Sequence, residues 1–491
     1  MRKNYEQQRS IGSIPISEVK IPLKSRDELP PILRALQYIF ITPALKEQVF
    51  EILKSKVLKG KKKTGRYGMG LWEIFVLSVV RLGLDANYDR LEDFANYHKL
   101  IRQIMGVDTP FGEGKSYSYQ SIKDNVSLLD EETLGEINEI VVSSGHRLLK
   151  KKEGIEVKAD TYVLETNVRF PTDLNLLWEA GRKCVDAIEY FRDKGFLRGK
   201  GWRKHKFWKR ELKNLMRSSS RAAFGGGKNK EATTKRRIEE YLCHAGKLSE
   251  KVAASVLELY EEALLREPID LKYVSPLKSL EYFHKMLDKH VDLVERRLLQ
   301  GERIPSGEKV HSLFEPHTEW LSKGKANKRV ELGHNILVAS DQWGFIVYHK
   351  VVEKEADVSL ALPLADALLG RYGEEGIASI SFDKGFYKKE NKDLLKLYIP
   401  QVVMPKKGKK NREEEAEESS RAFKKLRHRH SAVESDINRL EHHGLDRCPD
   451  KGLFAYKRYC ALGIVAANLH KLGNVLKDQA IKKQEKLPKA A

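Results

Sequence analysis

Hydrophobic residues in the first third of the chain recur at the spacing of helices. Leu33, Leu36 and Ile39 are three residues apart, so they share one face of a helix that is predicted from about Pro31 to Leu53. Leu71–Leu82 is almost continuously apolar but too short to span a membrane, which predicts a helix inside the core. Further helices are expected at 88–100, 117–128 and 131–149. Residues 31–152 are therefore predicted to form an all-helical domain, for which DNA-end binding and a scaffold or dimerisation role are equally open.

The hydrophobic period changes from helical to alternating at Ile155. Apolar side chains at Ile155, Val157, Ala159 and Val163 alternate with polar ones, which predicts a strand. Helical spacing returns from about 174 to 300. A hairpin is then expected around a turn at 341–344, followed by a helix at 359–369 and strands at 377–382 and 398–404. Residues 406–420 are predicted to be a charged connection, with helices at 419–443 and 452–475 and a frayed tail after Lys477.

This order of elements predicts an α/β (α+β) fold in which a long helical insertion interrupts a mixed sheet. The predicted parts are a flexible basic arm, an all-helical N-terminal domain, a sheet-containing domain in two pieces, a helical insertion and a basic tail. Their boundaries are, in the same order, 1–30, 31–152, 153–173 with 303–475, 174–302, and 476–491.

The composition adds a strong positive charge to this picture. The 491 residues include 90 Lys and Arg against 69 Asp and Glu, which gives a net charge of +21. Such an excess favours a polyanionic partner, with nucleic acid as the first candidate and an anionic membrane surface as the second, although a basic protein can also be merely soluble. The four cysteines are far apart, which excludes a disulfide scaffold and disfavours structural zinc. With no secretory signal expected, a reducing cytoplasm fits.

Three acidic residues stand where their carboxylates could converge. Asp160 lies within the first predicted strand, Asp383 follows the strand at 377–382, and Glu434 lies on a helix beside its apolar face. Phosphodiester chemistry commonly uses two divalent ions, and Mg²⁺ prefers carboxylate oxygens. Each acid alone is most simply a solvated or salt-bridged surface group. Their combination on two strands and a helix is what indicates a site.

Four blocks of sequence around these acids resemble DDE-type insertion-sequence transposases, with the ISNCY grouping as the closest. The blocks are residues 159–167 with 170–173, 311–318 with 323–325, 382–387, and 430–435 with 443–448. The resemblance extends over about residues 30–475 in order, and the four blocks together are specific. A better-known branch has a Tyr, Arg, Glu, Lys signature around its third acid. Arg427, His430 and Glu441 stand where the Tyr, Arg and Lys of that signature would be, so hairpin formation on transposon ends is not implied.

The resemblance implies an RNase H-like catalytic domain whose triad is Asp160, Asp383 and Glu434. These residues would also hold two Mg²⁺ ions, for which Mn²⁺ can substitute. The implied activity is cleavage at transposon ends, followed by attack of the 3′-hydroxyl on target DNA. The expected partners are inverted-repeat end DNA and target DNA, with at least a homodimer in the synaptic complex, no membrane, and a nucleoid-associated location in a prokaryotic cytoplasm. An RNase H-like nuclease or resolvase without strand transfer and a transposase-derived DNA-binding protein are the alternatives.

Two groups of basic residues are candidate DNA contacts, because cations bind phosphates and aromatic rings can stack on unpaired bases. The first group interleaves basic and aromatic side chains, and its alternative interpretation is a basic face over a core that holds one of the tryptophans. The second group flanks Asp383 and Glu434, and its alternative is a solvated helix face balanced by Glu413–Glu418. The first comprises Trp202, Arg203, Lys204, Lys206, Trp208, Lys209 and Arg210; the second comprises Lys384, Arg427, Arg429 and His430.

Overall fold

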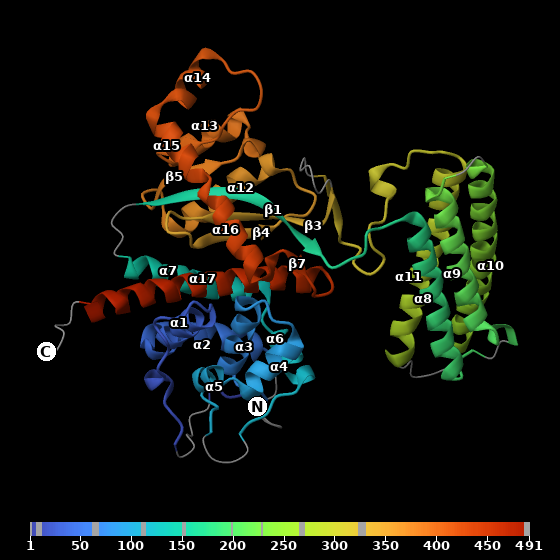
Figure 1. Cartoon of the computed structure of the whole chain (residues 1–491), viewed down its shortest axis with the longest axis horizontal. Helices are drawn as coiled ribbons and strands as arrows, with labels where there is room; N and C mark the ends of the chain where they lie inside the picture. The colour runs from blue at the N-terminus through green and yellow to red at the C-terminus, as the bar shows by residue number, and fades with distance from the viewer. Residues whose placement is uncertain are drawn as a thin grey trace. The chain divides into compact units, whose positions relative to one another are not determined.

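The chain divides into two compact units. The computed structural model describes residues 2–5, 12–60, 68–109, 114–149, 154–197, 200–226, 229–264, 271–322 and 330–485. The first unit contains residues 1–167 and 321–491 and holds most of a mixed sheet, and the second contains residues 168–320 and is helical (Figure 1). The segment 174–302 that was predicted as an insertion lies within the second unit. Residues 59–66 are rich in Lys and Gly, and most of them lie outside the described residues, as does the block at 323–325.

The N-terminal part of the first unit is helical, as its periodicity predicts. Every residue of α3 is buried, and Asp130 caps α7 by accepting a hydrogen bond from the backbone N–H of Thr133 (2.8 Å). The single helix expected from Pro31 to Leu53 is instead two helices, because Pro43 disfavours helical backbone at Thr42. The helices are α1 (Leu29–Ile41), α2 (Pro43–Val57), α3 (Leu71–Gly83), α4 (Tyr88–Tyr97), α5 (Lys99–Met105), α6 (Tyr119–Val126) and α7 (Glu131–Leu148).

The sheet is mixed, with β1 at its centre. β1 pairs antiparallel with β3 on one side and parallel with β5 on the other, β3 pairs antiparallel with β4, and β5 pairs parallel with β6. Across these five strands the order is therefore β4, β3, β1, β5, β6. The strands are β1 (Ile155–Thr166), β2 (Glu319–Ser322), β3 (Val330–Ser340), β4 (Ile346–Val351), β5 (Ile377–Phe382), β6 (Gln401–Val403) and β7 (Arg447–Cys448).

The helices that follow β4 differ from expectation in three places. The strand predicted at 398–404 is shortened to β6, because the chain up to Tyr398 belongs to an unpredicted helix, α13. The charged connection predicted at 406–420 contains another helix, α14, and the last helix continues past Lys477 to Glu485. These helices are α12 (Asp357–Tyr372), α13 (Lys389–Tyr398), α14 (Arg412–Ser419), α15 (Arg421–His430), α16 (Ala432–Leu440) and α17 (Leu453–Glu485).

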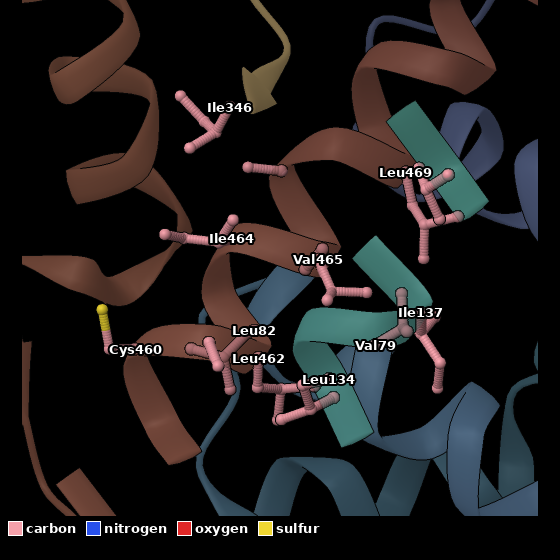
Figure 2. Close-up of a cluster of buried hydrophobic side chains, with 14 of the residues drawn as sticks. Val79, Leu82, Leu134, Ile137, Ile346, Cys460, Leu462, Ile464, Val465 and Leu469 are labelled. Atoms are coloured by element: carbon pink, nitrogen blue, oxygen red, sulfur yellow. The ribbon is translucent and has the colours of Figure 1, made fainter. Parts of the chain in front are cut away.

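One hydrophobic core joins the N-terminal helices to the sheet. Figure 2 shows Leu462 and Val465 of α17 beside Leu134 and Ile137 of α7, and all four are buried. Asn468 of α17 lies within this core and accepts a hydrogen bond from the backbone N–H of Ile346 on β4 (2.9 Å). The helices of residues 31–152 and the sheet thus share one continuous core within the first unit.

The contact between α17 and α1 depends on a glycine. A Cβ added to Gly473 would lie 1.8 Å from the backbone oxygen of Pro31, and backbone cannot move aside as a side chain can. We expect Gly473→Ala to lower the free energy of unfolding by about 3 kcal/mol through overpacking. Gly135→Ala on α7 is the control, because a Cβ there meets nothing within 4 Å and alanine favours a helix by up to about 1 kcal/mol. Urea denaturation monitored by circular dichroism measures the free energy of unfolding of both variants. Equal changes in the two variants would contradict the close contact at Gly473.

The second unit has a hydrophobic core of its own. It is built from α8 (Asp173–Asp193), α9 (His205–Phe224), α10 (Lys230–Leu264) and α11 (Leu271–Val294). A Cβ at Gly181 on α8 would lie 2.5 Å from Leu212 of α9, so this glycine allows the two helices to pack closely. None of the described helices in either unit combines the length and apolar character needed to cross a membrane.

Candidate active site and basic surfaces

Asp160 and Asp383 lie at the same level of two neighbouring parallel strands. Ala159 on β1 is in register with Phe382, the last residue of β5, so Asp160 and Asp383 are the next residues along the two strands. The backbone of Asp383 is still extended (φ −73°, ψ 167°) before the chain turns at Lys384–Phe386. Because residues in register on paired strands project toward the same face, we infer that both carboxylates lie on one face of the sheet. Asp160 is partly exposed and Asp383 is exposed.

Helix α16 brings Glu434 to the strand that carries Asp160. Lys158 is two residues before Asp160 and therefore projects from the same face of β1. Its ammonium lies 3.6 Å from the carboxylate of Asp436 on α16, and both residues are buried. Asp436 also lies 3.5 Å from Arg439 on the same helix. This buried group of charges fixes α16 against β1, and Glu434 is exposed in the first turn of that helix.

His430 lies close enough to Asp383 and Glu434 for their charges to affect its pKa. Its Nδ1 lies 3.1 Å from the hydroxyl of Ser381, which is the register partner of Lys158 on β5. Burial is the main reason that the pKa of His430 lies below its usual value, and the positive charge of Lys158 acts in the same direction, while Asp383 and Glu434 act against it. The lowered pKa disfavours the charged form of the His430 ring. Contact of His430 with DNA stays a prediction, and in the structure its ring is held beside Ser381.

The chemistry of the three acids suits a magnesium ion. Among the described residues, no three His, Cys, Asp or Glu side chains lie close enough to enclose a metal ion by themselves. Mg²⁺ keeps several waters and is usually held by one or two carboxylates together with substrate phosphates, so it does not need such an enclosure. The adjacent carboxylates of Asp160 and Asp383 supply the oxygen ligands that this mode of binding requires, and Glu434 is the third candidate.

The basic residues predicted near the acids differ in whether they are free to contact DNA or are already held in ion pairs. Arg429 forms an ion pair with Glu156 on β1 (2.6 Å), so it fixes α15 to the sheet. Arg427 is exposed and lies 3.9 Å from Glu418. Lys384 is exposed and directly follows Asp383. Lys384 and Arg427 therefore remain candidates for contact with DNA, whereas Arg429 would first have to leave Glu156.

The predicted basic and aromatic patch of the second unit is partly core. Trp202 is only 5% exposed and its indole N–H donates to the hydroxyl of Ser255 on α10 (2.8 Å), so it is the tryptophan that belongs to the core in the alternative interpretation. Trp208 is half-buried against His244, and Lys209 is paired with Asp186 (2.6 Å). The four other basic residues of the patch are exposed: Arg203, Lys204, Lys206 and Arg210.

Three residues that shape the site were not anticipated from the sequence. Lys158 and Asp436 connect β1 to α16, and Ser381 connects β5 to His430 at the end of α15. The alternating pattern of β1 could have identified Lys158, since it shares a face with Asp160. Ser381 and Asp436 carry no comparable signal, because their importance follows from register and helix docking.

Comparison of the chain with known protein families, with curated proteins and with solved structures found no match.

Proposed function

We propose that this protein is a DDE-type DNA transposase with an RNase H-like catalytic core. The observation that carries the proposal is the register of β1 with β5, because Asp160 and Asp383 directly follow the last paired residues, Ala159 and Phe382. A mixed sheet with an antiparallel hairpin on one side of its central strand and parallel strands on the other is what such a core requires. The helix that carries the third acid packs on the same central strand.

Each residue of the site has a role in this proposal. Asp160, Asp383 and Glu434 hold Mg²⁺ or Mn²⁺; when bound, such ions activate the attacking oxygen and stabilise the leaving oxygen. The Lys158–Asp436 ion pair positions α16, and with it Glu434, relative to Asp160. Lys384 and Arg427 supply positive charge for the phosphates on either side of the scissile bond.

The proposed reaction consists of two displacements at phosphorus. Water first attacks the phosphodiester at the end of the element, and the bond to the 3′-oxygen breaks to leave a 3′-hydroxyl. That hydroxyl then attacks a phosphodiester of the target, which releases the target's own 3′-oxygen. No covalent intermediate with the protein is needed. Joining two ends to one target requires two active sites, and therefore at least two copies of the chain.

A labelled duplex that carries the DNA flanking the gene tests the proposal. We expect the wild-type protein with Mg²⁺ to nick the end of the element and to join a pre-cut 3′-end to a target plasmid. Nicking without joining would favour a nuclease or resolvase. Binding without nicking would favour a DNA-binding protein that has lost the chemistry, and either result would overturn the proposal.

A further inference from the structure

Helix α14 is held in place by charges and not by a hydrophobic face. Its sequence is Arg-Glu-Glu-Glu-Ala-Glu-Glu-Ser, and Glu418 is its one buried residue. Ala416, its only apolar residue, is exposed. Helices in folded proteins are normally stabilised by packing an apolar face. This helix has none, so its place in the fold depends on the partners of its carboxylates.

Three of these carboxylates are paired with basic side chains from the surrounding elements. Glu414 accepts hydrogen bonds from Lys406 (2.8 Å) and from the hydroxyl of Tyr387 (3.1 Å). Glu417 lies 3.0 Å from both Lys392 and Lys396. Glu418 lies 2.5 Å from Lys410 and 3.9 Å from Arg427. We call the five cations the basic cradle: Lys392, Lys396, Lys406, Lys410 and Arg427.

The basic cradle carries more charge than α14 neutralises, and the attachment is weak. Five cations face three carboxylates, and all of the cations except Lys392 are partly or fully exposed. The ion pairs of Lys396 with Glu417 and of Lys406 with Glu414 are at least partly exposed, and such pairs each contribute at most about 1 kcal/mol and weaken as salt is added. Non-helical backbone also flanks the helix on both sides: Gly408 before it has a positive φ (84°), and Ser420 is extended between α14 and α15. The helix can therefore be displaced without disturbing a hydrophobic core.

The basic cradle borders the candidate active site. Tyr387, which binds Glu414, belongs to the segment that follows Asp383. Arg427 lies on α15, which leads through His430 to α16 and Glu434. Figure 1 shows α13, α14 and α15 grouped together at one end of the sheet-containing unit. A strand of DNA that crosses the three acids would therefore pass close to the basic cradle.

We propose that the basic cradle binds the phosphate backbone of DNA, and that α14 occupies it in the absence of DNA as an internal competitor. The carboxylates of Glu414, Glu417 and Glu418 stand in for phosphates. DNA displaces them because its higher charge density releases bound counterions, whereas the freed helix is simply hydrated. This inference rests on the proposed function only in taking DNA as the polyanion. Its consequence is that α14 limits binding to arbitrary DNA.

A pair of matched variants tests the competition. The pairing variant carries Glu414→Gln with Glu417→Gln, and the control variant carries Glu413→Gln with Glu415→Gln. Both remove two negative charges from α14, but Glu413 and Glu415 are exposed. After Glu414→Gln, the side-chain amide oxygen can still accept the backbone N–H of Asn411, so the change removes charge while keeping the capping box at the start of the helix. Thermal unfolding confirms that both variants remain folded.

Fluorescence anisotropy with a labelled duplex of random sequence, in EDTA, provides the measurement. We expect the pairing variant to bind the duplex about tenfold more tightly than wild type. The slope of the logarithm of the binding constant against the logarithm of salt concentration should be steeper by about one to two, because freed lysines contact phosphates. The affinity of the control variant for the duplex should rise about twofold at most, because only its net charge has changed. Equal gains in the two variants would overturn the proposal. So would a gain of the pairing variant for vesicles of phosphatidylserine with none for DNA, which would make the surface a membrane site.

A second comparison does not depend on the behaviour of the glutamate variants alone. Lys396→Gln with Lys410→Gln should weaken DNA binding about twofold in the wild-type background, where carboxylates of α14 pair with these lysines, and about tenfold in the pairing variant. Equal losses in both backgrounds would show that α14 does not compete. Because no metal is present, DNA cleavage plays no part in the result. Failure of the transposase proposal and failure of this one are therefore distinguished.

Discussion

Replacing Asp383 by Asn is expected to abolish cleavage of end DNA while leaving DNA binding within about twofold of wild type. The amide keeps the size of the side chain but removes the negative oxygen that a magnesium ion requires beside Asp160. A loss of at least about a thousandfold, equivalent to about 4 kcal/mol of transition-state stabilisation, should appear as the rate of nicking of a labelled end. Asp160→Asn and Glu434→Gln should behave in the same way.

The control for these three variants is an acid of the same domain that lies outside the site. Asp366 is exposed on α12, and Asp366→Asn removes the same charge. It should nick the labelled end at the wild-type rate, and circular dichroism should show that all four variants are folded. Mg²⁺-dependent nicking that survives in Asp383→Asn would show that the carboxylates of Asp160 within β1 and Asp383 after β5 do not form the active site.

The strands that carry the site were predictable because their patterns are local. Alternation identified β1 and the β3–β4 hairpin, and the strand expected at 377–382 is found as β5 with the same bounds. The position of Asp160 next to Asp383 could not be predicted from the local sequence pattern. It follows from the parallel register of two strands that are more than two hundred residues apart, and from the docking of α16 through Lys158 and Asp436.

Helix α14 was missed because hydrophobic periodicity cannot detect a helix without hydrophobic residues. A different signal was present: Asn411 and Glu414 form a capping box, in which each side chain binds the backbone N–H of the other residue. Helix α13 was also missed, and it buries Leu395 while Leu394 and Leu397 are exposed. The burial of Trp202 could not be read from local pattern either, because it packs in the core of the second unit and its indole N–H donates to Ser255 of α10.

Replacing Asp450 by Ala is expected to have the largest effect on the stability of the first unit. Asp450 precedes α17 and accepts hydrogen bonds from Arg81 of α3 (2.6 Å) and from Arg458 of α17 (3.0 Å), and all three side chains are at most 10% exposed. Removing the carboxylate leaves two buried guanidinium groups without their shared counter-charge. Such a loss costs about 3–5 kcal/mol, which urea denaturation can measure. Asp478→Ala on the exposed side of α17 should change the free energy of unfolding by less than about 0.5 kcal/mol.

The pH dependence of this stability distinguishes loss of the ion pairs from loss of packing. Burial alone would raise the pKa of Asp450, but the hydrogen bonds and charges of Arg81 and Arg458 outweigh it and hold that pKa below its usual value. A carboxyl whose pKa is depressed in the folded state stabilises the protein above its unfolded pKa of about 3.9, and this stabilisation is lost as the pH falls through the folded pKa. The difference between wild type and Asp450→Ala should therefore be constant from about pH 7 to pH 5 and shrink below about pH 4. A difference that stays unchanged to pH 3 would show that Asp450 acts through its volume and not through its charge.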